Sequence, residues 1–137
     1  MINMCEFYYN EDGTKIAILV SPGFGAGWST WNDRNLAYDR RVIKWWLTYK
    51  DHDAYIKELD KFGDNPVKEA TEQLFRSWGY DHVYFGGVND ISHLTWVDCE
   101  RPFRITEYDG AESIEFLDVH NYIIAPARGA SCYGTFE

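Results

Sequence analysis

The feature that most constrains this chain is a glycine-rich segment that follows a short apolar run near the N-terminus. The run ends at Val20, and Gly23, Gly25 and Gly27 then alternate with other residues ahead of Trp28. Glycines this closely spaced are unfavourable within a helix or a strand, because each loses more backbone entropy on folding than any other residue. We therefore predict a loop whose backbone adopts positive φ angles or approaches another group closely.

The composition of this loop favours a binding site for a small molecule. Backbone amides in such a bend, with the dipole of a following helix, can bind an anion, and nearby aromatic rings can stack on a planar group. No Gly-Lys-Ser/Thr follows the glycines, and their G-x-G-x-G spacing is not the dinucleotide fingerprint. The leading hypothesis is a nucleotide-like ligand. The alternative is a tight connection with Trp28 and Trp31 packed in the core.

A second candidate segment covers residues 104–110. On a strand, Arg104 and Thr106 share one face, so Arg104 is placed to hold a phosphate while Tyr108 or Asp109 meets a base or a ribose hydroxyl. Arg34 lies near the start of a predicted helix, within reach of a ligand at the loop or on a solvated charged face. The predicted ligand-binding residues are Gly23, Phe24, Gly25, Gly27, Trp28, Ser29, Thr30, Trp31, Asn32, Arg34, Arg104, Tyr108 and Asp109.

The pattern along the chain predicts an α+β fold. Residues 4–9 and 15–20 flank a polar Asp-Gly turn that is typical of an antiparallel hairpin. Apolar residues recur at helical spacing over residues 35–49 and 53–62, and Asn65 and Gly79 are the expected cap and stop of a third helix. Short strands are predicted at residues 82–85, 93–97, 103–107 and 122–125. Residues 113–117 are also predicted as a strand, with one helical turn as the alternative. We expect one domain over residues 1–137, with a mostly antiparallel sheet packed against about three helices.

Charge and segment composition exclude several classes of protein. A net charge of −9 argues against a general nucleic-acid binder, which needs clustered Lys and Arg. No signal-peptide pattern and no long apolar run is present, so no membrane association and a cytoplasmic location are expected. Cys5, Cys99 and Cys132 are then predicted to be free thiols.

No motif points to a cofactor, a metal or a catalytic group. No histidine pair has the helical spacing of a zinc site, no Cys-x-x-Cys occurs, and Ser29 lacks a G-x-S-x-G context. Glu112 and Glu115 are expected to face solvent rather than to form an acid–base pair. The weaker alternatives are a nucleophile pair of Cys99 with His82 or His93, and a metal held by Asp51 and Asp53 or by Glu107 and Asp109.

The segments GFGAGWSTWN and LAYDRRVIKWW, and the later FRITEYDGAESIEFLD, resemble small uncharacterised bacteriophage and prophage proteins. The resemblance implies a phage or prophage source, and it provides no catalytic residues to carry over to this sequence. By analogy of class, it also suggests an anti-defence sponge that sequesters a nucleotide signal of bacterial immunity without cleaving it.

Three functions therefore remain open. The first is a binding protein that encloses a nucleotide-like ligand, and the absence of a catalytic motif favours it. The second is a small enzyme acting on a phosphorylated or nucleotide substrate, with Glu107, Asp109 or Glu112 as base or metal ligand. The third is a protein–protein inhibitor of a host factor, marked by the 18% of aromatic residues. That aromatic content, with the glycine-containing tail at residues 127–137, also predicts a homo-oligomer.

Overall fold

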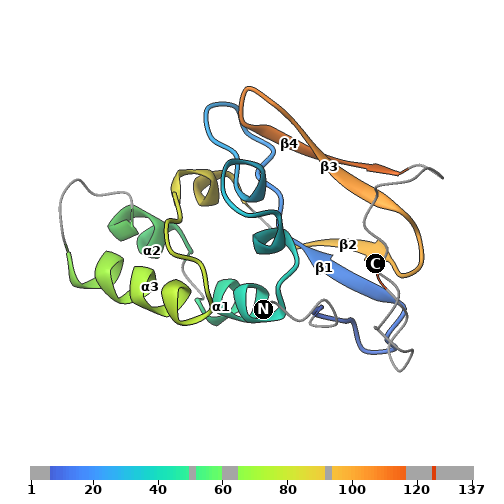
Figure 1. Ribbon diagram of the computed structural model, residues 1–137, viewed down its shortest axis with the longest axis horizontal. Coiled ribbons are helices and arrows are strands. Elements are labelled where there is room, and N and C mark those ends of the chain that lie inside the picture. Colours follow the sequence, from blue (N-terminus) through green and yellow to red (C-terminus); the bar gives the residue numbers. More distant parts are fainter. Residues whose placement is uncertain (1–6, 50–51, 60–64, 92–93, 117–124, 126–137) are drawn as a thin grey trace.

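In the described part of the chain, three helices follow one strand and precede three others, and in space the helices lie on one side of the molecule and the strands on the other (Figure 1). The computed structural model describes residues 7–49, 52–59, 65–91, 94–116 and 125 of the 137 residues. The α+β class is confirmed. In chain order the elements are β1 (Lys15–Ile18), α1 (Arg40–Thr48), α2 (His52–Leu59), α3 (Pro66–Ser77), β2 (Thr95–Asp98), β3 (Phe103–Tyr108) and β4 (Ala111–Phe116), with 3₁₀ turns at Ser29–Trp31, Arg34–Ala37 and Gly86–Asp90.

The strands form two antiparallel pairs rather than the single sheet that we predicted. β1 pairs with β2, from Lys15 opposite Asp98 to Ile18 opposite Thr95. β3 and β4 form a hairpin in which Tyr108 lies opposite Ala111. The hairpin turn has positive φ angles at Asp109 (49°) and Gly110 (87°), as a two-residue turn between twisted strands requires.

The helices begin where the sequence offers caps. The Asn65 side chain accepts a hydrogen bond from the Lys68 amide at the start of α3, and Gly79 follows the helix with a φ of 100°, as predicted. The helix predicted at residues 35–49 is divided. Asp39 is extended (ψ 124°) and its side chain caps the Arg41 amide, so a 3₁₀ turn ends before it and α1 begins after it.

The core has two clusters of buried side chains. One packs around α1 and α3 and contains most of the buried aromatic residues. The other lies between the β1–β2 pair and the β3–β4 hairpin. The first includes Leu19, Trp28, Leu36, Ile43, Trp45, Trp46, Phe75 and Phe85, and the second includes Phe7, Ile16, Ile18, Tyr38, Val97 and Phe103.

The strand predicted at residues 82–85 is wrong. The backbone there is irregular and leads into the Gly86–Asp90 turn. The side chain of Asn32 accepts a hydrogen bond from the Tyr84 amide (2.8 Å) and donates one to the Tyr84 carbonyl (2.9 Å). An asparagine side chain thus satisfies the backbone groups that a neighbouring strand would otherwise pair.

The predicted N-terminal hairpin is only partly formed in the described region. Tyr9 makes an isolated antiparallel bridge with Ile16 across the polar turn, but no regular strand covers residues 7–9. Several predictions lie outside the described residues: most of the strand at residues 122–125, the tail at residues 127–137, and Cys5, Asp51, His93 and Cys132.

Candidate functional site

The glycine-rich loop lies against the turn of the β3–β4 hairpin (Figure 1). A buried carboxylate, that of Glu112, joins the two. Glu112 is only 3% exposed. Its Oε1 accepts a hydrogen bond from the Ser21 amide (2.9 Å). Its Oε2 accepts from the amides of Trp28 (2.9 Å) and Thr30 (3.0 Å) and from the Thr30 hydroxyl (2.6 Å). This one side chain therefore holds both ends of the loop.

The expectation that Glu112 faces solvent is wrong. Glu112 stands directly opposite Glu107 in the β3–β4 register, so the two carboxylates lie on the same face of the hairpin. The loop covers that face, and Glu107 Oε2 accepts hydrogen bonds from the Trp31 indole nitrogen (2.9 Å) and from the Gly110 amide (2.7 Å). Strand alternation alone could not show which face the loop would cover.

The loop amides that we predicted to bind an anionic ligand are thus hydrogen-bonded to a side chain of the same chain. A bend of free amides can hold a phosphate or a carboxylate, and here the amides of Trp28 and Thr30 hold the Glu112 carboxylate. The loop has the chemistry of an anion site. An external anion would have to displace a buried side chain to use it.

The glycines allow the loop to approach its neighbours closely. Gly25 has a φ of 105°, and its amide donates to the Asp109 carbonyl (2.8 Å). A Cβ on Gly110 would lie 2.4 Å from the backbone nitrogen of Ala26. A Cβ on Gly87 would lie 2.2 Å from the carbonyl oxygen of Gly27. Backbone-to-backbone packing of this kind leaves no room for a side chain at Gly87 or Gly110. A Cβ on Gly25 would meet nothing within 4 Å, so only its positive φ favours glycine there.

The two tryptophans of the loop have different environments. Trp28 is fully buried and its indole nitrogen donates to the Leu36 carbonyl (3.0 Å), while its ring stacks beside Trp45. This is the core-packed alternative considered for Trp28, and it excludes the ring from a surface site. Ser29 is also buried, and its hydroxyl has no hydrogen-bond partner among the described residues. Trp31, in contrast, is 45% exposed.

The structure does not bring the predicted arginines together at the loop. Arg104 stands opposite Glu115 and forms an ion pair with it (3.2 Å), on the face of the hairpin opposite to Glu112. At about 3.3 Å per residue, it lies roughly 13 Å along β3 from Tyr108. Arg34 is exposed in the 3₁₀ turn that follows the loop.

Four exposed aromatic residues gather around the loop and the hairpin turn, and we call them the aromatic patch. They are Phe24 (70% exposed), Trp31 (45%), Tyr84 (55%) and Tyr108 (78%). The rings of Trp31 and Tyr84 are stacked with centroids 6.1 Å apart, and those of Phe24 and Tyr108 meet edge to face at 6.5 Å. Glu107 binds the indole of Trp31. Tyr108 follows Glu107 in β3, where consecutive side chains point to opposite faces, so the Tyr108 ring lies on the other face of the strand end.

Sequence reasoning missed Tyr84, which it placed in a strand. No pattern in the sequence identifies Tyr84, because its position depends on the hydrogen bond between its backbone and the Asn32 side chain, 52 positions away. The other three members of the patch were predicted as ligand-binding residues. Three of the predicted residues, Phe24, Trp31 and Tyr108, thus belong to the patch. The charged side chain bonded to it is Glu107, whereas Arg104 pairs with Glu115.

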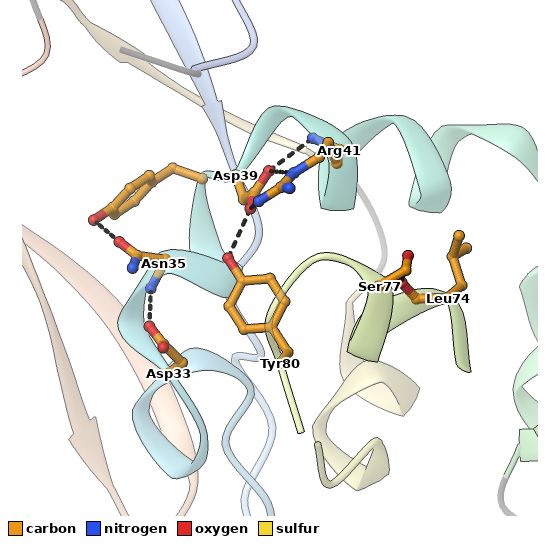
Figure 2. A network of polar contacts seen from close by, with 8 residues as sticks. Asp33, Asn35, Asp39, Arg41, Leu74, Ser77 and Tyr80 are labelled. Carbon is orange, nitrogen blue, oxygen red and sulfur yellow. Dashed lines mark hydrogen bonds and ion pairs between the residues drawn. The ribbon is translucent and has the colours of Figure 1, made fainter. Parts of the chain in front are cut away.

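A second polar network lies away from the loop, at the start of α1 (Figure 2). The buried Asp39 carboxylate accepts hydrogen bonds from Arg41 Nη2 (2.8 Å) and from the Tyr80 hydroxyl (2.7 Å). Burial alone would raise the pKa of Asp39, but these bonds outweigh it and hold that pKa below 3.8. Burial and the Asp39 carboxylate raise the pKa of Tyr80. The network fastens the turn after α3 to the N-terminus of α1, so we assign it a structural role.

Within the described part of the chain, no three His, Cys, Asp or Glu side chains are grouped as a metal site would need. No helix in the same part is both long and apolar enough to cross a membrane. Comparison of the chain with protein-family models, with curated proteins and with solved structures gave no significant match.

Proposed function

We propose that this chain is a binding protein that contacts a partner protein through the aromatic patch. The observation that supports this is the gathering of four exposed aromatic side chains from three separate segments: the loop, the residues before the Gly86–Asp90 turn, and the end of β3. The rings form two contacting pairs, Trp31 with Tyr84 and Phe24 with Tyr108. Large exposed apolar patches mark sites of interaction with other molecules. Tyrosine and tryptophan are the side chains that most often dominate the energy of protein interfaces.

The hydrogen bonds beneath the patch support the same proposal. Glu112 and Glu107 tie the loop to the hairpin, and Asn32 ties it to Tyr84, so the rings are presented by a cross-linked scaffold. A surface that is already ordered pays less entropy on binding. This arrangement corresponds to the third of the functions left open by the sequence, an inhibitor of a host protein.

The proposal is tested by capture of partners with matched surface variants. The patch variant is Phe24→Ser with Tyr108→Ser, and the control is Leu47→Ser with Leu74→Ser, which changes two exposed apolar side chains of α1 and α3. The resemblance to phage proteins makes a bacterial extract the source to use. A partner identified by mass spectrometry should bind the wild type and the control with equal affinity, and the patch variant at least about tenfold more weakly. Equal affinity for the patch variant would contradict the proposal.

A nucleotide-like ligand is the second candidate, and one observation favours it. The stacked pair of Trp31 and Tyr84 leaves aromatic surface exposed on which a base can stack, with the exposed Arg34 three residues further along the chain. The purified protein would be incubated with linear, cyclic and ADP-ribose-type nucleotides, washed and heat-denatured. Release of one intact nucleotide by the wild type but not by Trp31→Ala would favour sequestration. A processed product would indicate an enzyme.

A further inference from the structure

We propose that the aromatic patch binds an arginine side chain of its partner, with the guanidinium group paired to the Glu107 carboxylate and lying against the rings of Trp31 and Tyr84. This inference rests on the proposed function and specifies the chemistry of the partner. Three features support it: the acidic residues near the patch, the second carboxylate oxygen of Glu107, and the exposed rings of Trp31 and Tyr84.

The charges near the patch favour a cation. Glu107 and Asp109 flank Tyr108 on either side, and Asp33 follows Trp31 by two positions, while Arg34 is the nearest cationic residue in the sequence. The whole chain carries a net charge of −9. An acidic surface attracts a basic partner and disfavours an anionic one.

Glu107 has the geometry to accept a guanidinium group. Its Oε2 already accepts hydrogen bonds from the Trp31 indole and the Gly110 amide, while its Oε1 has no hydrogen-bond partner in the described part of the structure. The bond from the Trp31 indole, and to a lesser degree that from the Gly110 amide, hold the pKa of Glu107 below 4.5, so the carboxylate is charged at neutral pH. Because Oε2 makes both bonds and Glu107 is an exposed residue, Oε1 is left to accept a hydrogen bond from a ligand near the indole.

The rings provide the second half of the site. Cations are attracted to the faces of Trp and Tyr rings. Arginine suits a carboxylate beside such a ring better than lysine does, because its planar guanidinium group can stack on the ring while its N–H groups bind the carboxylate. Contacts of a guanidinium group with an aromatic ring also occur among the described residues. The guanidinium of Arg101 lies 3.8 Å from the ring centroid of Phe116, and that of Arg41 lies 5.7 Å from Trp78.

The test uses a single arginine side chain as the probe. N-acetyl-arginine N-methylamide would be titrated at fixed ionic strength, with the Trp31 indole N–H followed by NMR and assigned with a Trp31→Phe variant. The control probe is the citrulline analogue, which has nearly the same shape and no charge. We expect a saturable shift of the Trp31 signal with the arginine probe and binding about tenfold weaker with citrulline, as loss of one charge-assisted bond implies.

Two matched protein variants complete the test. In Glu107→Gln the side-chain oxygen can still accept both internal hydrogen bonds, so the rings stay in place while the charge is lost. We expect it to bind the arginine probe several-fold more weakly. Glu115→Gln, on the opposite face of the same hairpin, should bind it as the wild type does. Equal binding of citrulline, or wild-type binding by Glu107→Gln, would overturn the inference.

The failure of this inference can be told apart from the failure of the proposed function. If the partner is captured through the patch but the arginine probe does not shift Trp31, the proposed function stands and the arginine assignment is wrong. If the probe binds but capture of the partner is the same for the patch variant and the wild type, the protein-binding proposal is wrong.

Discussion

Replacement of Glu112 by glutamine tests whether one buried carboxylate holds the glycine-rich loop in place. The carboxylate accepts four hydrogen bonds, three from backbone amides and one from the Thr30 hydroxyl. Glutamine has almost the same shape, but one of its two terminal atoms is a nitrogen that donates rather than accepts. Its side-chain amide cannot satisfy all of these donors.

The expected cost follows from the better of the two amide orientations. If the glutamine oxygen faces the amides of Trp28 and Thr30, its NH₂ group faces the buried Ser21 amide, and that donor is left unpaired. An unpaired buried donor costs about 1–3 kcal/mol, and the remaining bonds lose their charge assistance. Removing a buried charge recovers part of this through a smaller desolvation penalty. We expect the free energy of unfolding to fall by about 2–4 kcal/mol.

Urea unfolding followed by tryptophan fluorescence would measure the change, with Glu115→Gln as the matched control. Glu115 undergoes the same chemical change on the same strand but forms a solvent-exposed ion pair with Arg104, which is worth less than about 1 kcal/mol. Hydrogen exchange of the Trp28 and Thr30 amides would show whether the loop opens locally. The reasoning is refuted if Glu112→Gln changes stability no more than the control does and leaves both amides protected.

Two further substitutions test the packing and the polar network. Gly110→Ala should lower the free energy of unfolding by about 2–4 kcal/mol, because it adds both strain at a positive φ and a clash with the Ala26 backbone. Gly79→Ala, whose Cβ would meet nothing within 4 Å, should cost only about 1 kcal/mol. Equal losses of stability in chemical denaturation would contradict the close approach of Gly110 to Ala26. Asp39 has its pKa held below 3.8 by hydrogen bonds that include one from Tyr80, so its contribution to stability is present above about pH 4 and is lost as the pH falls through the folded-state pKa. Asp39→Asn should therefore be less stable than the wild type at pH 7 by about 2–3 kcal/mol, and it should lose less further stability than the wild type when the pH is lowered. Thermal unfolding curves that shift with pH equally in the variant and the wild type would count against this assignment.

Local signals in the sequence predicted the helices well. Capping residues and stop residues act within one helical turn, so Asn65 and Gly79 could be assigned from their neighbours alone. The break at Asp39 was missed because its cause is tertiary. The carboxylate is buried and bonded to Tyr80, 41 positions away, and this contact stabilises an extended residue inside an otherwise helical pattern.

The strands were predicted less completely, for a related reason. The Asp-Gly dipeptide of the β3–β4 hairpin is a local turn signal, and it lies between the strands predicted at residues 103–107 and 113–117. The pairing of β1 with β2 joins residues about 80 positions apart, and no local pattern specifies it. At residues 82–85 the apolar composition suggested a strand, but the Asn32 side chain occupies the backbone groups that a strand would pair.

The sequence alone determined that residues 21–32 form a loop rich in backbone donors, because closely spaced glycines exclude regular structure and leave their amides unpaired by a helix or a sheet. Only the tertiary structure decided which anion those donors bind. The Glu112 carboxylate comes from a strand more than 80 positions away, and its contact with the Trp28 amide depends on the packing of the hairpin against the loop. That packing also separates the tryptophans, burying Trp28 and leaving Trp31 exposed beside Glu107.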